Sequence, residues 1–162
     1  MNRNKTLQLA NAGMIAALYV ALTWIANLLG LASGAIQVRL SEALTILPVF
    51  TVSAVPGLAV GCVLANLLTG CAAWDVVFGS LATLIGALGT RLLKNKPMLA
   101  WIPPVVSNAA IVPVILLKVY GVPDAWWFLV LTVGAGELIS CGLLGLLLWK
   151  ALKNVPQIRG MK

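Results

Sequence analysis

Long apolar segments follow one another along this sequence, separated by short polar breaks. The first runs from about Leu7 to Leu29, and the last from Asp124 to Leu152. An apolar segment of about 20 residues is long enough to cross the hydrocarbon core of a bilayer as an α-helix. A helix also satisfies its own backbone hydrogen bonds where no water is present. The pattern therefore predicts an all-α integral membrane protein.

The composition agrees with a chain immersed in lipid. Its 162 residues are 61% hydrophobic and only 9% charged, with a mean hydropathy of +1.03. This length fits one transmembrane domain, residues 1–162, and no polar stretch is long enough for a separate catalytic or nucleotide-binding domain. Energy for any transport must come from an ion gradient or from a partner protein.

The number of spans depends on the stretch from Ser41 to Gly70. It is either one long span or two short ones broken at SAVPG, where Pro56 and Gly57 form a turn signal. With two spans, every basic cluster falls on one side of the membrane, as the positive-inside rule requires. We therefore expect a bundle of six transmembrane helices with both termini cytoplasmic: residues 7–29, the two halves of 41–70, and then 75–93, 98–120 and 124–152.

The positions of the basic residues indicate which way the chain crosses the membrane. Only Arg39 and Lys118 are expected on the outer side, so the net charge of +7 indicates orientation and not a nucleic-acid partner. The residues expected in the cytoplasm are Arg3, Lys5, Arg91, Lys94, Lys96, Lys150, Lys153, Arg159 and Lys162.

The cysteines give no sign of a metal or a cofactor. Cys62, Cys71 and Cys141 stand singly in apolar or glycine-rich surroundings, and the sequence has no C-x-x-C motif and no histidine. We expect them to pack, and we expect neither metal nor cofactor.

Acidic residues are few and therefore informative. Glu137 lies within the last span, about 15 Å below Trp127 at 1.5 Å per residue, which places it near the middle of the membrane. An ionisable group at that depth is a candidate functional residue. The alternative is a structural hydrogen bond, for example to Asn108 on the preceding span.

A second group of polar residues is expected near the outer level. Arg39 and Glu42 are three residues apart and could simply pair on one helix face. With amides and an indole nearby, they would instead suit a flat, nitrogen-rich ring, which carboxylates and amides bind through hydrogen bonds and an aromatic face binds by stacking. The other members of this predicted pocket are Gln37, Asn66, Trp74 and Asp75.

Small residues on the first helix suggest close helix packing. Ala12 with Ala16, and Ala17 with Ala21, form small-xxx-small pairs beside Gly13. The pattern alone fits packing within the bundle or docking to a separate partner.

Four segments together resemble the family of queuosine-precursor transporters, QueT. Members are regarded as substrate-binding S components of energy-coupling factor (ECF) transporters. The segments are IQVRLSEALTILP (36–48), PGLAVGCVLANLLTG (56–70), WDVVFGSLATLIGA (74–87) and GELISCGLLG (136–145).

The resemblance implies a six-helix S-component bundle in the bacterial cytoplasmic membrane. It implies an outward pocket for a 7-deazaguanine, such as 7-cyano- or 7-aminomethyl-7-deazaguanine or queuine. It also implies no enzymatic activity of its own, since ATP is hydrolysed by two separate ATPases that act with a transmembrane coupling protein. The Ala12 to Ala16 pattern matches the partner-docking motif, and we expect the adjacent Ala17 to contact the partner as well. The family's motif residues at matching positions include Gln37, Arg39, Glu42, Asp75, Asn108 and Glu137, and we expect them to bind the substrate.

Three other functions compete with this one. One is a self-sufficient transporter in which Glu137 exchanges a proton for substrate. Another is an S component for a different vitamin. The third, a membrane enzyme, is disfavoured because the sequence offers no histidine, no metal-ligand cluster and no nucleophile–base pair at a readable spacing.

Overall fold

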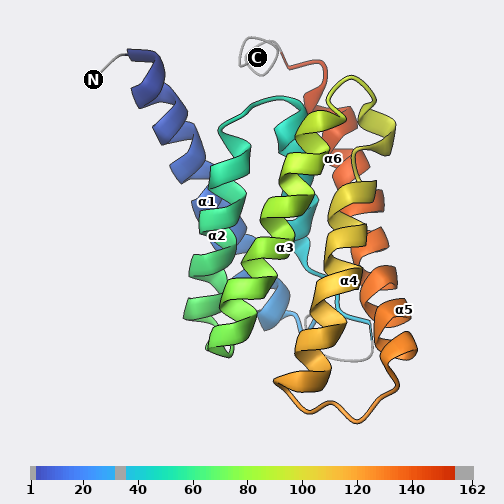
Figure 1. Ribbon diagram of the computed structural model, residues 1–162. Coiled ribbons are helices and arrows are strands. Elements are labelled where there is room, and N and C mark those ends of the chain that lie inside the picture. Colours follow the sequence, from blue (N-terminus) through green and yellow to red (C-terminus); the bar gives the residue numbers. More distant parts are fainter. Residues whose placement is uncertain (1–2, 32–35, 156–162) are drawn as a thin grey trace.

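The computed structural model describes residues 3–31 and 36–155. In them the chain forms six helical segments, joined by short connections, and no strand (Figure 1). The all-helical prediction is therefore confirmed. The segments are α1 (Arg3–Leu28), η1 (Leu40–Val49), α2 (Ala54–Leu68), α3 (Ala73–Leu92), η2 (Pro97–Leu99) with α4 (Ile102–Lys118), and a last rod made of α5 (Trp126–Glu137), η3 (Leu138–Leu144) and α6 (Gly145–Leu152).

Four of the segments are long and apolar enough to cross a bilayer. They cover residues 5–28, 73–92, 97–118 and 126–152. The chain is therefore a multi-pass membrane protein. The two remaining segments, η1 and α2, are shorter.

The expected break between the second and third segments is present, but it lies earlier than SAVPG indicated. Residues 50–53 separate η1 from α2, and Pro56 lies in the first turn of α2. Proline is tolerated there because the first amides of a helix have no intrahelical acceptor. The Pro56–Gly57 pair therefore begins a helix instead of forming a turn.

The segment η1 was expected to span the membrane and does not do so alone. It is a 3₁₀-helix of 10 residues. At about 2.0 Å per residue it reaches about 20 Å, whereas the hydrocarbon core is about 30 Å thick. It packs against α1, α2, α3, η3 and α6. Its polar side chains Ser41, Glu42 and Thr45 are consequently buried in protein instead of facing lipid.

Small residues let α1 and α2 approach closely. A Cβ atom added to Gly61 of α2 would lie 2.8 Å from Tyr19 Cβ and 3.0 Å from Ala16 Cα. Such contacts are closer than side chains normally permit, so the backbones meet across glycine and alanine. This contact fixes Tyr19 at the centre of the bundle, where it is fully buried.

The last rod changes its winding halfway along. Between α5 and α6, η3 is a π-helix, in which hydrogen bonds skip one residue more than in an α-helix. Wider turns of this kind occur frequently at functional sites. Here the wide turns pack against η1.

One end of the bundle collects the basic residues. At this end α1 begins, α3 connects to α4, and α6 ends (Figure 1). Arg39 and Lys118 lie at the opposite end. This distribution agrees with the positive-inside rule, while the orientation itself stays a prediction. The basic residues at this end are Arg3, where α1 begins, and Lys5, Arg91, Lys94, Lys96, Lys150 and Lys153, whereas Arg159 and Lys162 lie outside the described residues.

Candidate functional site

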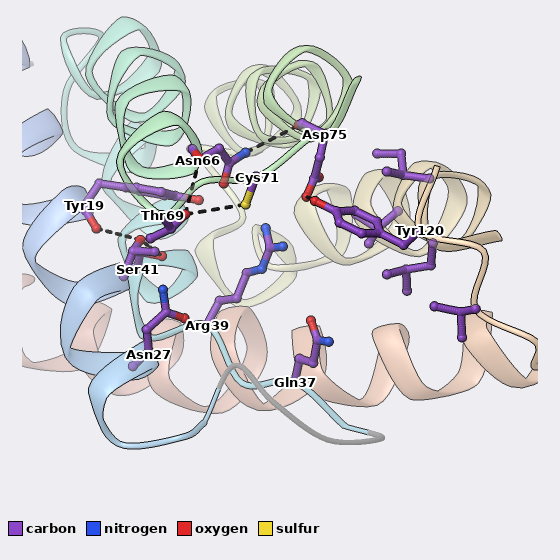
Figure 2. A pocket seen from close by; sticks show the side chains of 16 residues that line it. Tyr19, Asn27, Gln37, Arg39, Ser41, Asn66, Thr69, Cys71, Asp75 and Tyr120 are labelled. Carbon is purple, nitrogen blue, oxygen red and sulfur yellow. Dashed lines mark hydrogen bonds between the residues drawn. The ribbon is translucent and has the colours of Figure 1, made fainter. Parts of the chain in front are cut away.

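A polar cavity of about 400 Å³ lies at the end of the bundle opposite the basic residues. It is formed by α1, the segment before η1, the α2–α3 connection and the end of α4, so residues far apart in sequence meet there (Figure 2). Its volume is within the usual range for small-molecule sites. The lining residues are Tyr19, Thr23, Ala26, Asn27, Gln37, Arg39, Ser41, Asn66, Thr69, Cys71, Asp75, Val112, Ile115, Leu116, Tyr120 and Val122.

Arg39 reaches into the middle of this cavity (Figure 2). Its backbone N–H donates to Ser140 Oγ at 3.1 Å, and the Ser140 hydroxyl donates to the carbonyl of Gly136 at 2.9 Å. The Arg39 guanidinium forms no hydrogen bond or ion pair with any residue that the structure describes. Its donors are therefore available to a ligand.

Gly136 allows this segment to approach the last rod. A Cβ atom at Gly136 would overlap the carbonyl oxygen of Gln37. Only glycine leaves room for the backbone here. Gly136 therefore helps to place both Gln37 and Arg39.

Asp75 provides the acidic wall of the cavity. It lies in the first turn of α3 and is 6% exposed. Its Oδ2 accepts a hydrogen bond from Tyr120 at 2.9 Å, and the same phenol oxygen accepts one from the Ala72 amide at 3.1 Å. Oδ1 has no hydrogen-bond partner within 3–31 and 36–155. It can therefore accept a hydrogen bond from a ligand.

Tyr120 remains a hydrogen-bond donor. Desolvation, together with the hydrogen bond to Asp75, raises the pKa of Tyr120 to about 12. The phenol therefore keeps its proton at neutral pH.

The α2–α3 connection contributes further polar atoms. The Asn66 amide donates to the backbone carbonyl of Asp75 at 3.4 Å, and Thr69 Oγ1 lies 3.4 Å from Cys71 Sγ (Figure 2). Gly70 between them has a φ of +73°, a conformation that favours glycine. The turn thus holds three polar side chains at the cavity wall.

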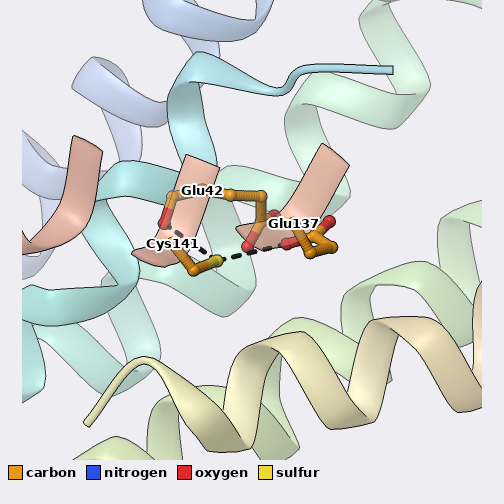
Figure 3. A group of neighbouring side chains, drawn as sticks. All are labelled: Glu42, Glu137 and Cys141. Carbon is orange, nitrogen blue, oxygen red and sulfur yellow. Dashed lines mark hydrogen bonds between the residues drawn. The ribbon is translucent and has the colours of Figure 1, made fainter. Parts of the chain in front are cut away.

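A second polar group lies in the interior of the bundle, and we call Glu42, Glu137 and Cys141 the inner cluster (Figure 3). All three are buried, and one donor atom from each lies within 4.8 Å of the others, so this group could hold a metal ion. The Cys141 thiol donates to Glu137 Oε2 at 3.1 Å. Tyr19 donates to Glu42 Oε1 and also lines the cavity, so it connects the two sites.

The inner cluster has unsatisfied neighbours. Glu42 Oε2 and Asn108 Nδ2 are buried and find no hydrogen-bond partner among the described residues. The Asn108 side chain faces Glu137 closely enough to interact with its carboxylate, although Nδ2 lies beyond ordinary hydrogen-bond distance.

The structure separates the eight predicted substrate residues into three groups. Gln37, Arg39, Asn66 and Asp75 line the cavity, whereas Glu42, Asn108 and Glu137 do not. Trp74 is also absent from the cavity wall: it is 61% exposed on the outside of the bundle.

The expected stacking role of Trp74 in the pocket is therefore not supported. Adjacent residues on a helix point about 100° apart, so Trp74 turns outward where Asp75 faces the cavity.

Several lining residues were not predicted. Tyr19, Thr69, Cys71 and Tyr120 all contribute polar atoms. One signal was available, because Tyr19 and Tyr120 are the chain's two tyrosines and each lies in an aliphatic stretch. A buried tyrosine hydroxyl needs a partner.

The alanines expected to dock a partner differ in position. Ala16 is buried against Gly61, and the Ala12 carbonyl lies 2.7 Å from where a Cβ of Gly57 would be, so both take part in packing within the chain. Ala17 is exposed. Ala12, Gly13 and Ala16 also line an open groove of about 540 Å³ between α1 and α2.

A multi-pass helical bundle with a polar cavity at one end is the architecture of a membrane transport protein. The QueT transporter family model matches residues 9–154, and the chain belongs to this family. It is 35% identical over 86 residues to the queuosine precursor transporter QueT of Lactococcus lactis subsp. cremoris (strain MG1363), a match covering 52% of this chain and 50% of that protein. No solved structure matches the chain.

Proposed function

We propose that the chain is the substrate-binding S component of an ECF-type importer for a queuosine precursor of the 7-deazaguanine class. The observation that carries this proposal is the pairing of an unengaged Arg39 with an available Asp75 oxygen in one cavity of a QueT-family chain. The site would lie on the outer face of the bacterial cytoplasmic membrane.

The hydrogen-bonding groups on the ligand's ring indicate how the cavity would bind it. A 7-deazaguanine presents a carbonyl acceptor next to a ring N–H and an exocyclic amine. Arg39 would donate to the carbonyl, and Asp75 Oδ1 would accept from the N–H and amine edge. The amides of Gln37 and Asn66 offer both donors and acceptors for the remaining polar atoms. A cationic aminomethyl substituent would add attraction through the Asp75 carboxylate on the cavity wall.

The chain would not hydrolyse ATP itself. A transmembrane coupling protein and two ATPases would supply the energy. The coupling protein would dock at the α1–α2 groove, which Ala12, Gly13 and Ala16 line, and would also contact the exposed Ala17, four residues after Gly13 on α1.

Binding to the purified protein tests the substrate class. Titration calorimetry with 7-aminomethyl-7-deazaguanine, 7-cyano-7-deazaguanine, queuine and guanine is compared with riboflavin, thiamine and biotin. We expect a deazapurine to bind about a hundredfold more tightly than any vitamin, since a site built for one hydrogen-bond pattern rejects others strongly. Tighter binding of one of the vitamins would instead indicate an S component for that vitamin.

The buried pair of Glu42 and Glu137 favours one other function, a transporter driven by protons without a partner. Uptake into vesicles distinguishes the two. We expect no accumulation of deazapurine by this chain alone under an imposed pH gradient, and accumulation once coupling protein, ATPases and ATP are present. Accumulation driven by the gradient alone would establish the proton-coupled function.

A further inference from the structure

An apolar groove of about 640 Å³ runs along the outside of the bundle between α3 and α4. One wall is formed by Trp74 and Phe78, whose rings stack with centroids 5.8 Å apart and planes inclined by 17°. The other wall includes Ala110 and Val114 of α4. The groove is a different space from the polar cavity, and Ile115 lines both.

The groove faces the bilayer. Both of its helices belong to segments long and apolar enough to span a membrane. Trp74 is 61% exposed and Val114 is 48% exposed, so their apolar surfaces are not covered by the described chain. In a membrane, acyl chains are the molecules that meet such a surface.

One positive charge marks the end of the groove. Lys118, in the last turn of α4, lines it and is exposed. Its ammonium forms no ion pair with any residue in the described parts of the chain. Trp74 lies at the same end of the groove, in the first turn of α3. Tryptophan and lysine are typical of the level at which lipid headgroups begin.

We propose that this groove binds one anionic phospholipid, with an acyl chain along Ala110 and Val114 against the Trp74–Phe78 stack and the headgroup phosphate on Lys118. An apolar channel that ends in an unpaired cation matches an amphiphile of opposite charge. A protein helix would fit the apolar part but would leave the Lys118 charge without a counterpart. The bound lipid would also support Ile115, which separates the groove from the polar cavity.

Native mass spectrometry of the full chain, released from detergent with equal amounts of phosphatidylglycerol and phosphatidylcholine, tests this proposal. We expect one phosphatidylglycerol to be retained in preference to phosphatidylcholine by about fivefold, the effect of one lysine near an anionic headgroup. Lys118→Gln should remove that preference without changing the retention of phosphatidylcholine. Ala110→Phe should fill the groove and lose both lipids.

Lys150→Gln is the matched control, because Lys150 is an exposed lysine at the opposite end of the bundle. It should keep the preference. The proposal is overturned if the unmodified chain shows no preference, if Lys118→Gln keeps it, or if Lys150→Gln abolishes it as fully as Lys118→Gln does. If Ala110→Phe retains both lipids and melts at the same temperature as the unmodified chain, the groove is excluded as the lipid-binding site.

Discussion

The Tyr120 hydroxyl, just beyond the end of α4, donates a 2.9 Å hydrogen bond to Oδ2 of Asp75 in the first turn of α3. The bond joins two neighbouring helices at the polar cavity and leaves the other carboxylate oxygen of Asp75 available. Tyr120 therefore acts as a positioning residue for Asp75 in the proposed site.

Replacing this phenol should weaken ligand binding moderately. Tyr120→Phe removes a hydrogen bond worth about 0.5 to 1.5 kcal/mol, so the dissociation constant of the best deazapurine should rise about two- to tenfold. Calorimetry on the purified protein measures this change. Trp74→Phe is the control and should bind normally, since Trp74 lies outside the cavity. Weaker binding by Trp74→Phe, with normal binding by Tyr120→Phe, would instead favour stacking on Trp74.

Gly136 should be needed for binding although it contributes no side chain. The methyl group of Gly136→Ala would overlap the Gln37 carbonyl, which should displace the segment carrying Arg39 and lower both ligand affinity and melting temperature. At Gly134 an added Cβ would meet its nearest neighbour, Ala109 Cβ, at an ordinary 4.0 Å. Gly134→Ala should therefore leave both quantities unchanged. Equal effects of the two variants would contradict this role of Gly136.

Docking to a coupling protein can be tested without disturbing the bundle. A Cβ atom at Gly13 would meet nothing within 4 Å, so Gly13→Leu should fold and bind substrate normally. It should fail to co-purify with the coupling protein and ATPases, because the added side chain occupies the α1–α2 groove. Ala151→Leu, an exposed substitution on α6 outside the grooves and the cavity, should assemble normally. Normal assembly of Gly13→Leu would place the docking surface elsewhere.

The helical content and the number of segments were predictable because apolar length and basic clustering act over whole segments. The winding of individual segments was not predictable in this way. η1 is a 3₁₀-helix that is buried by the neighbouring helices. Its burial depends on how those helices pack and not on the sequence of η1 itself. The same holds for the π-helix between Leu138 and Leu144.

The residues that line the polar cavity were predicted only in part. A residue lines the cavity only if it lies at the right level of the bundle and its side chain points inward. Arg39 and Asp75 were found from their charges. Trp74 was expected beside Asp75 from its level in the membrane, but the helix turns it to the outside. Glu137 was expected at the ligand from its depth, and this stays a prediction; its side chain lies in the inner cluster beside Glu42 and Cys141. Neither direction could be known before the helices were packed.

Cysteine labelling tests the orientation. In a Cys71→Ser background, Asn95→Cys, in the α3–α4 connection, should resist impermeant thiol reagents in intact cells because the basic end is expected in the cytoplasm. Asp124→Cys, between α4 and α5, should react readily. Both positions are exposed, and Cys62 and Cys141 are buried, so background labelling should be low. The reverse labelling pattern would invert the proposed topology.

In the proposed function, the ligand binds in the polar cavity and not at the inner cluster. This placement is tested most directly by calorimetry with 7-aminomethyl-7-deazaguanine on the unmodified chain, Asp75→Asn and Glu137→Gln. Asp75→Asn offers the ligand's N–H edge one acceptor fewer, and an unpaired buried donor costs about 1 to 3 kcal/mol, so the dissociation constant should rise about 5- to 150-fold. Glu137→Gln should bind like the unmodified chain, because Glu137 does not line the cavity. Unchanged binding by Asp75→Asn, together with lost binding by a folded Glu137→Gln, would contradict the account and move the substrate to the inner cluster.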